Sequence, residues 1–270
     1  MKEFVIFGNP VVHSKSPQMQ NAGFKHLKFD ANYEKFHLEN GKELKNEFIK
    51  NGFLGANITV PHKEDAFLQA DEVVGIAKDI KAVNTYILKD DKVFAYNTDA
   101  PGFIKAIESF GKIKKVLVLG AGGTSKAICL ALKEKNIDTV VLNRSKNRLD
   151  FFKENDIKTY SWEEFEQLEN IPTFDLVVNS TSAGLKDDLL PASKEILEKV
   201  LRKSSFAFDC IYGKITPFLA LAEKLDNLTK DGEDMLLFQG VLAFELFTNT
   251  KADEILIEAM RKGLKEKYLS

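Results

Sequence analysis

The sequence predicts an α/β protein in which a doubly wound parallel sheet is joined to a second α/β domain. Strand-like runs at 116–119, 139–142, 176–179 and 206–209 are each followed by a turn and a helical pattern, a rhythm that is typical of parallel sheets covered by helices. A glycine-rich turn directly follows the first run. The last part of the chain also predicts strongly apolar helices, which need a surface to pack against.

Length and composition agree with two domains and exclude several functional classes. The 270 residues can bury a large core. A net charge of −2, from 38 basic and 40 acidic residues spread along the chain, gives no nucleic-acid footprint. The first apolar run is too short for a signal segment, and the stretch 235–247 is too short and too interrupted to span a bilayer. We therefore expect a cytoplasmic protein, a monomer or homodimer, that binds a small molecule and neither nucleic acid nor membrane.

The glycine-rich turn lies in the stretch K-V-L-V-L-G-A-G-G-T-S-K-A, residues 115–127. Its apolar run suits a strand buried on both faces, Gly120, Gly122 and Gly123 turn the chain, and Thr124 is expected to cap the next helix. Backbone N–H groups and the positive helix end would then face one small volume that favours a pyrophosphate. A full dinucleotide motif has Gly or Ala where Ser125 stands, so these residues alone leave an ordinary strand-to-helix turn open.

The end of the second strand indicates which dinucleotide would bind. Folds specific for NAD carry Asp or Glu about 20 residues past the glycines, to hold the ribose 2′-hydroxyl. This chain has Asn143-Arg144 there. Arg144 can pair with a 2′-phosphate through planar, bidentate contacts, whereas Arg148 suits a phosphate contact and a solvated helix residue equally well. The sequence therefore favours NADP.

The first hundred residues predict strands at 4–7, 32–37 and 57–60 and a hairpin of 82–88 with 92–96. In the third strand Asn57 and Thr59 share a face that meets water or a ligand, which leaves Ile58 and Val60 for the core. Ser14 and Ser16 precede a helix at about 18–27 and could simply cap it.

The closing helices, 235–247 and 252–264, are too apolar to stand alone. We expect them to pack on the first hundred residues, with an inner stripe of Ile255, Leu256, Ala259, Met260 and Leu264. This predicts a discontinuous substrate domain, 1–100 with 233–270, interrupted by a Rossmann-type cofactor domain, 101–232, with the site in the cleft between them. The four histidines lack metal-ligand spacing, so we expect no metal and histidines on the surface or in loops.

Several short motifs follow one another along nearly the whole chain. They are H-S-K-S-P (13–17), G-A-N-I-T-V-P-H-K (55–63), A-V-N-T (82–85), N-T-D-A-P-G (97–102), G-A-G-G (120–123), N-R-S (143–145), N-S-T-S-A-G (179–184) and D-G-E-D-M-L-L-F-Q-G (231–240). Together, and in this order, they resemble the shikimate dehydrogenase family.

The resemblance implies the reversible, NADPH-dependent reduction of 3-dehydroshikimate to shikimate in aromatic amino acid biosynthesis. Lys63 and Asp99 would form the acid–base pair, in which the ammonium polarises the ketone and the carboxylate orients it, with the proton transferred by one of the two. Hydroxyl groups suit the substrate carboxylate, and amides and carboxylate suit its ring hydroxyls. The implied substrate contacts are Ser14, Ser16, Asn57, Thr59, Lys63, Asn84, Asp99, Tyr212 and Gln239. The implied cofactor contacts are Gly120, Ala121, Gly122, Gly123, Thr124, Asn143, Arg144, Ser145, Arg148, Thr181, Ile211 and Gly232.

Four positions depart from the family pattern. Gln20 stands in place of His, Ser145 in place of Thr, Ser180 in place of Ala and Lys214 in place of Pro. We expect the last to leave the loop around Tyr212 less rigid. Two other functions remain as alternatives: an NAD-dependent quinate/shikimate dehydrogenase, which Arg144 and the paired serines argue against, and a non-catalytic binding module, which the presence of both Lys63 and Asp99 argues against.

Overall fold

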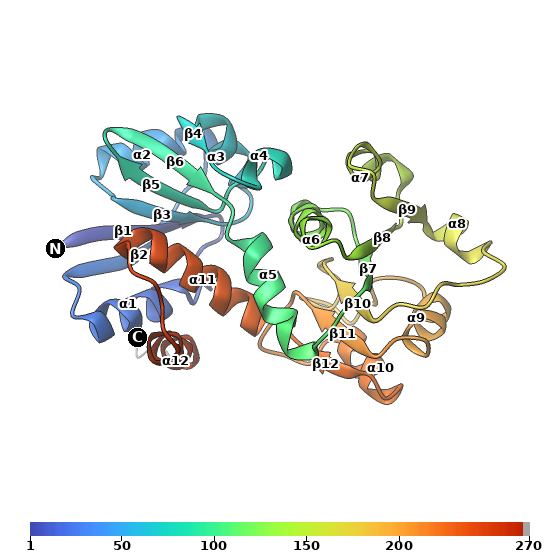
Figure 1. Cartoon of the computed structure of the whole chain (residues 1–270). Coiled ribbons are helices and arrows are strands. Elements are labelled where there is room, and N and C mark those ends of the chain that lie inside the picture. Colours follow the sequence, from blue (N-terminus) through green and yellow to red (C-terminus); the bar gives the residue numbers. More distant parts are fainter. Residues whose placement is uncertain (267–270) are drawn as a thin grey trace. The chain divides into compact units, whose positions relative to one another are not determined.

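The computed structural model describes residues 1–266, which form two compact units. The first unit comprises Met1–Gly102 together with the described chain from Leu236 onward, and the second comprises Phe103–Met235. Two helices, α5 (Asp99–Ile107) and α11 (Glu233–Thr248), contain the boundaries between the units. Figure 1 shows the two sheets and their helices.

The first unit is built on a mixed six-stranded sheet in the order β2-β1-β3-β5-β6-β4. Its strands are β1 (Lys2–Gly8), β2 (Ala31–His37), β3 (Gly55–Ile58), β4 (Glu72–Val73), β5 (Thr85–Lys89) and β6 (Lys92–Tyr96). Strand β1 is parallel to β2 and β3, whereas β5 is antiparallel to both β3 and β6. The carboxyl ends of β1, β3 and β6 and the start of β5 therefore lie at one edge of the sheet, where α/β folds commonly bind ligands.

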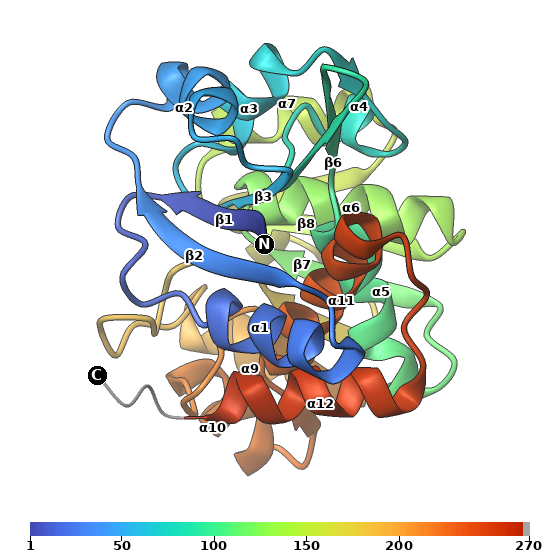
Figure 2. The same ribbon diagram turned by 90° about the vertical axis from the view of Figure 1, so that its left-hand side faces the viewer.

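Helices cover both faces of this sheet, and the period-2 alternation of β1 assigns each side chain to a face. Phe4 and Ile6 pack with α1 (Ser16–Leu27), α11 and α12 (Glu254–Lys265). Val5 and Phe7 pack with α2 (Leu44–Lys50), α3 (Lys63–Gln69) and α4 (Ala77–Ile80), and a short 3₁₀ turn, Gly41–Glu43, precedes α2. Figure 2 shows α1 and α12 lying side by side. The last helices thus complete the core of the unit that the first hundred residues begin.

Two buried positions predicted from periodicity are wrong in this unit. Strand β3 ends at Ile58, so the alternation stops there and Val60 is 68% exposed. Ile255 is also 68% exposed, because Leu256, Met260 and Leu264, four residues apart on one face of α12, point into the core and Ile255 lies on another face. Ala259, predicted in the same stripe, is only half-buried. The hairpin is confirmed, with both turn residues, Asp90 and Asp91, at positive φ, as a type I′ turn requires.

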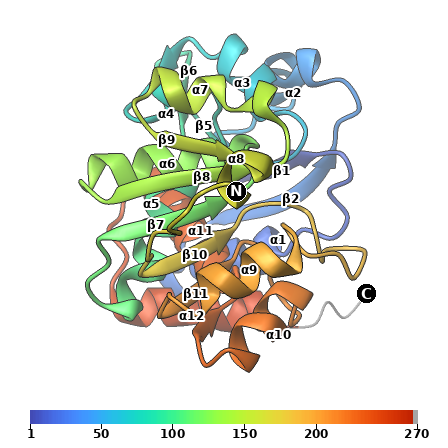
Figure 3. The ribbon, with the colours of Figure 1, turned by 90° about the vertical axis from the view of Figure 1, so that its right-hand side faces the viewer.

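The second unit contains an all-parallel sheet in the order β12-β11-β10-β7-β8-β9. Its strands are β7 (Lys115–Leu119), β8 (Asp138–Asn143), β9 (Lys158–Ser161), β10 (Leu176–Asn179), β11 (Phe206–Asp209) and β12 (Leu228–Lys230). This is the order of a doubly wound dinucleotide-binding fold, and its direction reverses between β7 and β10, where the ligand crevice is expected. Figure 3 shows β9, β8, β7, β10 and β11 in succession.

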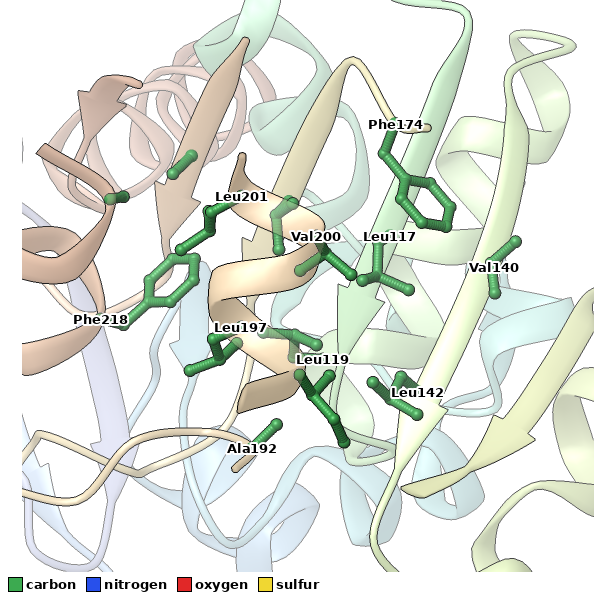
Figure 4. Packing of buried hydrophobic residues seen from close by; sticks show 14 of the residues in the cluster. Leu117, Leu119, Val140, Leu142, Phe174, Ala192, Leu197, Val200, Leu201 and Phe218 are labelled. Atoms are coloured by element: carbon green, nitrogen blue, oxygen red, sulfur yellow. The ribbon is translucent and has the colours of Figure 1, made fainter. Parts of the chain in front are cut away.

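Helices flank this sheet, and those that follow β7, β8, β10 and β11 were predicted, whereas α8 was not. They are α6 (Gly123–Glu134), α7 (Asp150–Glu154), α8 (Trp162–Glu166), α9 (Lys194–Leu201) and α10 (Pro217–Lys224), with 3₁₀ turns at Glu108–Phe110 and Lys146–Arg148. Figure 4 shows Leu197, Val200 and Leu201 of α9 packed between Phe218 of α10 and apolar strand residues such as Leu117. Residues Val116 to Leu119 are fully buried, which confirms a strand covered on both faces.

The structure also corrects smaller predictions. Thr124 does not cap α6: the N-cap position is Gly122, whose N–H donates to Ser125 Oγ at 3.2 Å. His62 lies in the turn before α3, as expected of a loop histidine, but its side chain is buried, with Nε2 2.7 Å from the Leu38 carbonyl oxygen. Within residues 1–266, no group of three His, Cys, Asp or Glu side chains could hold a metal ion, and no helix has the length and apolar character needed to cross a membrane.

Candidate active site

An ion pair between Lys63 and Asp99 lies at the ligand-binding edge of the first sheet. Lys63 begins α3, just beyond β3, and Asp99 begins α5, just beyond β6. Lys63 Nζ is 2.6 Å from Asp99 Oδ2, and the two side chains are 27% and 16% exposed. A short, charge-assisted hydrogen bond therefore holds an ammonium group where a ligand can reach it.

Asn84 connects this ion pair to its surroundings. Its Nδ2 donates to Asp99 Oδ1 at 3.0 Å and to Thr98 Oγ1 at 2.9 Å, and it lies 3.4 Å from Gln239 Oε1. Each Asp99 oxygen thus has its own donor, Lys63 on Oδ2 and Asn84 on Oδ1. The carboxylate is fixed in one orientation beside the ammonium group.

Backbone contacts hold the segments that carry these side chains. The Val83 N–H donates to the Lys63 carbonyl oxygen at 3.0 Å. Asn97 donates to the Ala82 carbonyl oxygen and accepts from the N–H of Ala100. Asn97, the first residue of the motif N-T-D-A-P-G, therefore links the start of α5 to the segment before β5 by hydrogen bonds.

Gly102 explains the end of the same motif. A Cβ atom there would lie 2.7 Å from the Gln239 backbone nitrogen and 2.9 Å from its Cβ. Helices α5 and α11 can approach closely at this point only because residue 102 has no side chain. This approach brings the predicted substrate residue Gln239 to Asn84.

The remaining predicted substrate residues lie in three places. Ser14 and Ser16 follow β1, and the Ser16 N–H bonds the Ser14 hydroxyl at 3.3 Å. Thr59 follows β3, and its N–H bonds the Phe7 carbonyl oxygen at 2.9 Å. Asn57 is buried and bonded within the unit. Tyr212 lies in the second unit, just beyond β11, and is 37% exposed.

In the second unit, hydroxyl groups fasten the glycine-rich turn to the loop after β10. Ser180 Oγ donates to the Leu119 carbonyl oxygen at 2.7 Å, so Ser125 Oγ, also 2.7 Å away, must donate to Ser180. Ser125 Oγ in turn accepts from the Gly122 N–H. Gly120 has φ +106°, which favours glycine. The two serines that depart from the expected motifs therefore stabilise the turn.

The loop after β10 is held by buried polar groups. Asn179 Oδ1 accepts from the backbone N–H and the hydroxyl of Thr181, while its Nδ2 donates to Asp209 Oδ2 at 3.0 Å. Thr216 and the Ile211 N–H also donate to the Asp209 carboxylate. Burial raises the pKa of Asp209, against the lowering effect of these donors. The carboxylate connects the loops that follow β10 and β11.

A cavity of about 450 Å³ opens at the carboxyl ends of β7, β8 and β10. Seven predicted cofactor residues line it: Gly120, Ala121, Gly122, Asn143, Arg144, Arg148 and Thr181. The other five predicted cofactor residues are not among the lining residues. Gly123 and Ser145 directly follow lining residues, Thr124 follows Gly123, and the Gly232 N–H is bonded to the Ile211 carbonyl oxygen. The cavity therefore joins the glycine-rich turn to both arginines.

A dinucleotide phosphate fits the residues present. Cβ atoms built on Gly122 and Gly123 would meet no atom within 4 Å, so the turn leaves open space beside the start of α6. The first N–H groups of a helix lack intrahelical partners and attract anions. Two guanidinium groups line the same cavity. This donor set would suit a pyrophosphate at the turn and a further phosphate at Arg144.

Trp162 lines the cavity at the start of α8 and was not among the residues predicted from the sequence. Strand β9, directly before it, is short and polar and gave no strand signal. A usable signal was present, because Ser161 and Glu164 form a capping box, and Ser followed three residues later by Glu marks a helix start. Trp162 is the chain's one tryptophan, and its position makes it a spectroscopic probe of the cavity.

The other departures also have partners. Gln20 Nε2 donates to the Gly240 carbonyl oxygen at 2.9 Å, which links α1 to α11 beside Gln239. Lys214 Nζ donates to the Leu185 carbonyl oxygen at 3.1 Å. Lys214 therefore adds a contact to the loop around Tyr212, which the sequence predicts to be less rigid.

Three family models match successive parts of the chain. They are described as "Shikimate dehydrogenase substrate binding domain" over residues 6–86, "Shikimate / quinate 5-dehydrogenase" over 105–209 and "Shikimate 5'-dehydrogenase C-terminal domain" over 232–265.

Individual relatives agree. The chain is 43% identical to the NADP(+) shikimate dehydrogenase of Helicobacter hepaticus, over 96% of this chain and 95% of that protein. The corresponding Helicobacter pylori protein is 41% identical, over 92% and 93%. Among solved structures, the Thermus thermophilus shikimate 5-dehydrogenase with NADP(H) and shikimate gives a TM-score of 0.85 at 31% identity, covering 98% and 99% of the two chains. The Aquifex aeolicus shikimate dehydrogenase gives 0.86 at 30%, covering 98% of each.

Proposed function

The chain belongs to the shikimate dehydrogenase family, and we propose that its first unit binds shikimate on the Lys63–Asp99 pair while its second unit binds NADP. It is an NADP-dependent oxidoreductase that interconverts shikimate and 3-dehydroshikimate in aromatic amino acid biosynthesis. The single observation that carries the assignment of residues is the 2.6 Å contact of Lys63 Nζ with Asp99 Oδ2, beside Asn84.

Lys63 is the proton donor to the ketone in this proposal. Its ammonium polarises the ketone oxygen, and it gives up its proton as the oxygen becomes a hydroxyl. Asp99 keeps Nζ aimed at that oxygen and accepts a hydrogen bond from a neighbouring ring hydroxyl. Asn84 and Gln239 contact the ring hydroxyls, while Ser14, Ser16 and Thr59 supply hydroxyl groups for the substrate carboxylate.

Residues of the second unit hold NADP, which supplies the hydride when it is bound. The glycine-rich turn, residues 120–124, would receive the pyrophosphate, and Arg144 would receive the 2′-phosphate, with Arg148 lining the same cavity. Asn143 holds its loop in shape, since its Nδ2 donates to the Ser145 carbonyl oxygen at 2.9 Å. Thr181 lines the same cavity, and Ile211 and Gly232, bonded to each other, would contribute further contacts to the cofactor. A cytoplasmic location and a monomeric or homodimeric state remain predictions from the sequence.

Lys63→Ala tests the proposal in an assay of absorbance at 340 nm with shikimate and NADP⁺. We expect turnover to fall roughly 10²- to 10⁴-fold, the usual contribution of a positioned acid–base group, while Trp162 fluorescence still reports normal NADPH binding. Quinate with NAD⁺ is the competing substrate pair in the same assay and should react more slowly with the wild type.

A matched control is available in the first unit. Lys45 and Asp71 form another ion pair with an Nζ–Oδ1 distance of 2.6 Å, and the Lys45 side chain is as exposed as that of Lys63. Lys45→Ala should leave turnover near the wild-type value. Near-normal turnover of Lys63→Ala would remove Lys63 from the mechanism.

A further inference from the structure

Tyr33 carries a buried hydroxyl group at some distance along the chain from any predicted site residue. It lies on β2, is 1% exposed, and its ring packs near Phe247 with centroids 6.2 Å apart. Its hydroxyl is 2.7 Å from Asn57 Oδ1. Burial raises the pKa of Tyr33 well above its usual value, so the hydroxyl remains protonated and available as a donor.

The orientation of the Asn57 amide follows from its backbone partner. Asn57 Nδ2 is 3.2 Å from the Asn84 carbonyl oxygen, which can only accept. The nitrogen must therefore face that carbonyl, and Oδ1 must face Tyr33. The tyrosine hydroxyl consequently donates to Asn57, and it satisfies an amide oxygen that is buried from water.

The next link is the hydroxyl of Thr85. It accepts from Asn57 Nδ2 at 3.1 Å and donates to Asn84 Oδ1 at 3.0 Å. The backbone N–H of Thr98, which can only donate, also reaches Asn84 Oδ1, at 2.8 Å. Both donors place the oxygen of the Asn84 amide away from the ion pair, so Nδ2 faces Asp99 Oδ1. Each donor in this series fixes the direction of the next group.

We propose that Tyr33 is a positioning residue for the reaction, which acts through Asn57 and Thr85 to hold the Asn84 amide toward Asp99 and shikimate. The proposal rests on the proposed function of Lys63, Asn84 and Asp99. Removing the Tyr33 hydroxyl leaves Asn57 Oδ1 buried without a donor, which favours a displacement of that amide from its present position. As Asn57 Nδ2 moves away from Thr85, the Thr85 hydroxyl is less firmly directed to Asn84. Asn84 Oδ1 then loses one of its three donors and keeps the N–H and the hydroxyl of Thr98.

The test is Tyr33→Phe, which keeps the ring and removes only the hydroxyl. We expect kcat/KM for shikimate to fall roughly three- to tenfold, the effect of one ordinary hydrogen bond, with KM for NADP⁺ unchanged. Tyr86→Phe is the matched control: Tyr86 is also fully buried in the first unit, but its hydroxyl bonds the Ala66 backbone carbonyl oxygen. It should lower the free energy of unfolding and leave KM for shikimate unchanged.

Thr85→Val gives a second, independent measurement, because it breaks the next link while keeping the side-chain shape. It should reproduce the loss in kcat/KM, and Tyr33→Phe should add little in the Thr85→Val background, since the two groups act in series. Equal effects of Tyr33→Phe and Tyr86→Phe, or additive effects of Tyr33→Phe and Thr85→Val, would overturn the proposal. Failure of the proposed function would appear separately, as normal turnover of Lys63→Ala.

Discussion

Three asparagines organise the polar residues of the first unit, because an amide can donate and accept at once. Asn57, Asn84 and Asn97 each bond one backbone group and at least one further group. Polarity and strand alternation allowed Asn57 to face either water or a ligand. The structure gives a third outcome, in which its amide is buried and bonded within the protein. Its partner Tyr33 is 24 residues away, and local patterns carry no information on such pairs.

Arg144 is the residue whose role is most directly testable. A bidentate, charge-assisted contact to a 2′-phosphate contributes about 1.5–3 kcal/mol, so Arg144→Ala should weaken NADPH binding roughly 10- to 100-fold. NADH, which lacks that phosphate, should bind with unchanged affinity. Trp162 lines the same cavity, and titration of its fluorescence with each nucleotide measures both dissociation constants without relying on turnover.

Two other arginines provide comparisons for this experiment. Arg148 also lines the cavity, and Arg148→Ala decides between a phosphate contact and a solvated residue. Arg202, at the end of α9, is outside the cavity-lining set, and its alanine variant should bind NADPH normally. Equal weakening of NADPH and NADH by Arg144→Ala would show that Arg144 does not recognise the 2′-phosphate.

Elements with a strong apolar run were predictable, and short polar edge strands were not. Strand β7 and helix α6 follow from Val116 to Leu119 and the glycines after them. Strand β9 reads K-T-Y-S and β12 reads L-T-K, so neither has an apolar run. Both lie at the edges of the sheet, where pairing with a neighbouring backbone, rather than burial of side chains, defines the strand. Missing β9 also meant missing the adjacent Trp162.

The start of α8 gives a prediction about pH. The Ser161 N–H donates to Glu164 Oε2 at 2.8 Å, and this contact, followed by the one to Lys146, lowers the pKa of Glu164 to about 2. Because the folded pKa is below the unfolded value of 4.5, the carboxylate stabilises the fold above that pH. This contribution is lost as the pH falls from about 4.5 to about 2.

Urea unfolding of the wild type and Glu164→Gln across this range measures the effect. The difference in free energy of unfolding should be present at pH 6 and should shrink steadily below about pH 4.5. Glu163→Gln removes a neighbouring carboxylate that is not part of the capping box, and so controls for the loss of one charge in the first turn. A Glu164→Gln difference that stayed constant down to pH 2 would contradict the role of the capping box.

At the scale of the molecule, each unit encloses its own core. The return of α11 and α12 to the first unit was predictable, because helices so apolar need a partner surface, and Phe244, Met260 and Leu264 do pack with Phe4 and Phe24. The order of the strands in the first sheet was harder to predict from the sequence. The order β3-β5-β6-β4 depends on pairings between segments whose local sequence contains no signal for a particular partner.

Two self-contained cores give a prediction about where each ligand protects the chain. A bound ligand lowers the population of open states by RT ln(1 + [L]/Kd), about 2.7 kcal/mol at a hundredfold excess over Kd, and the effect is greatest for amides that contact it. In hydrogen–deuterium exchange measured by mass spectrometry, NADP⁺ alone should slow peptides covering 120–124, 143–148 and 180–183. Shikimate alone should slow peptides covering 57–63, 83–85 and 97–100. The peptides that only shikimate should protect serve as the control for NADP⁺, and the peptides that only NADP⁺ should protect serve as the control for shikimate. Equal protection of 57–63 and 120–124 by NADP⁺ alone would contradict the assignment of one ligand to each unit.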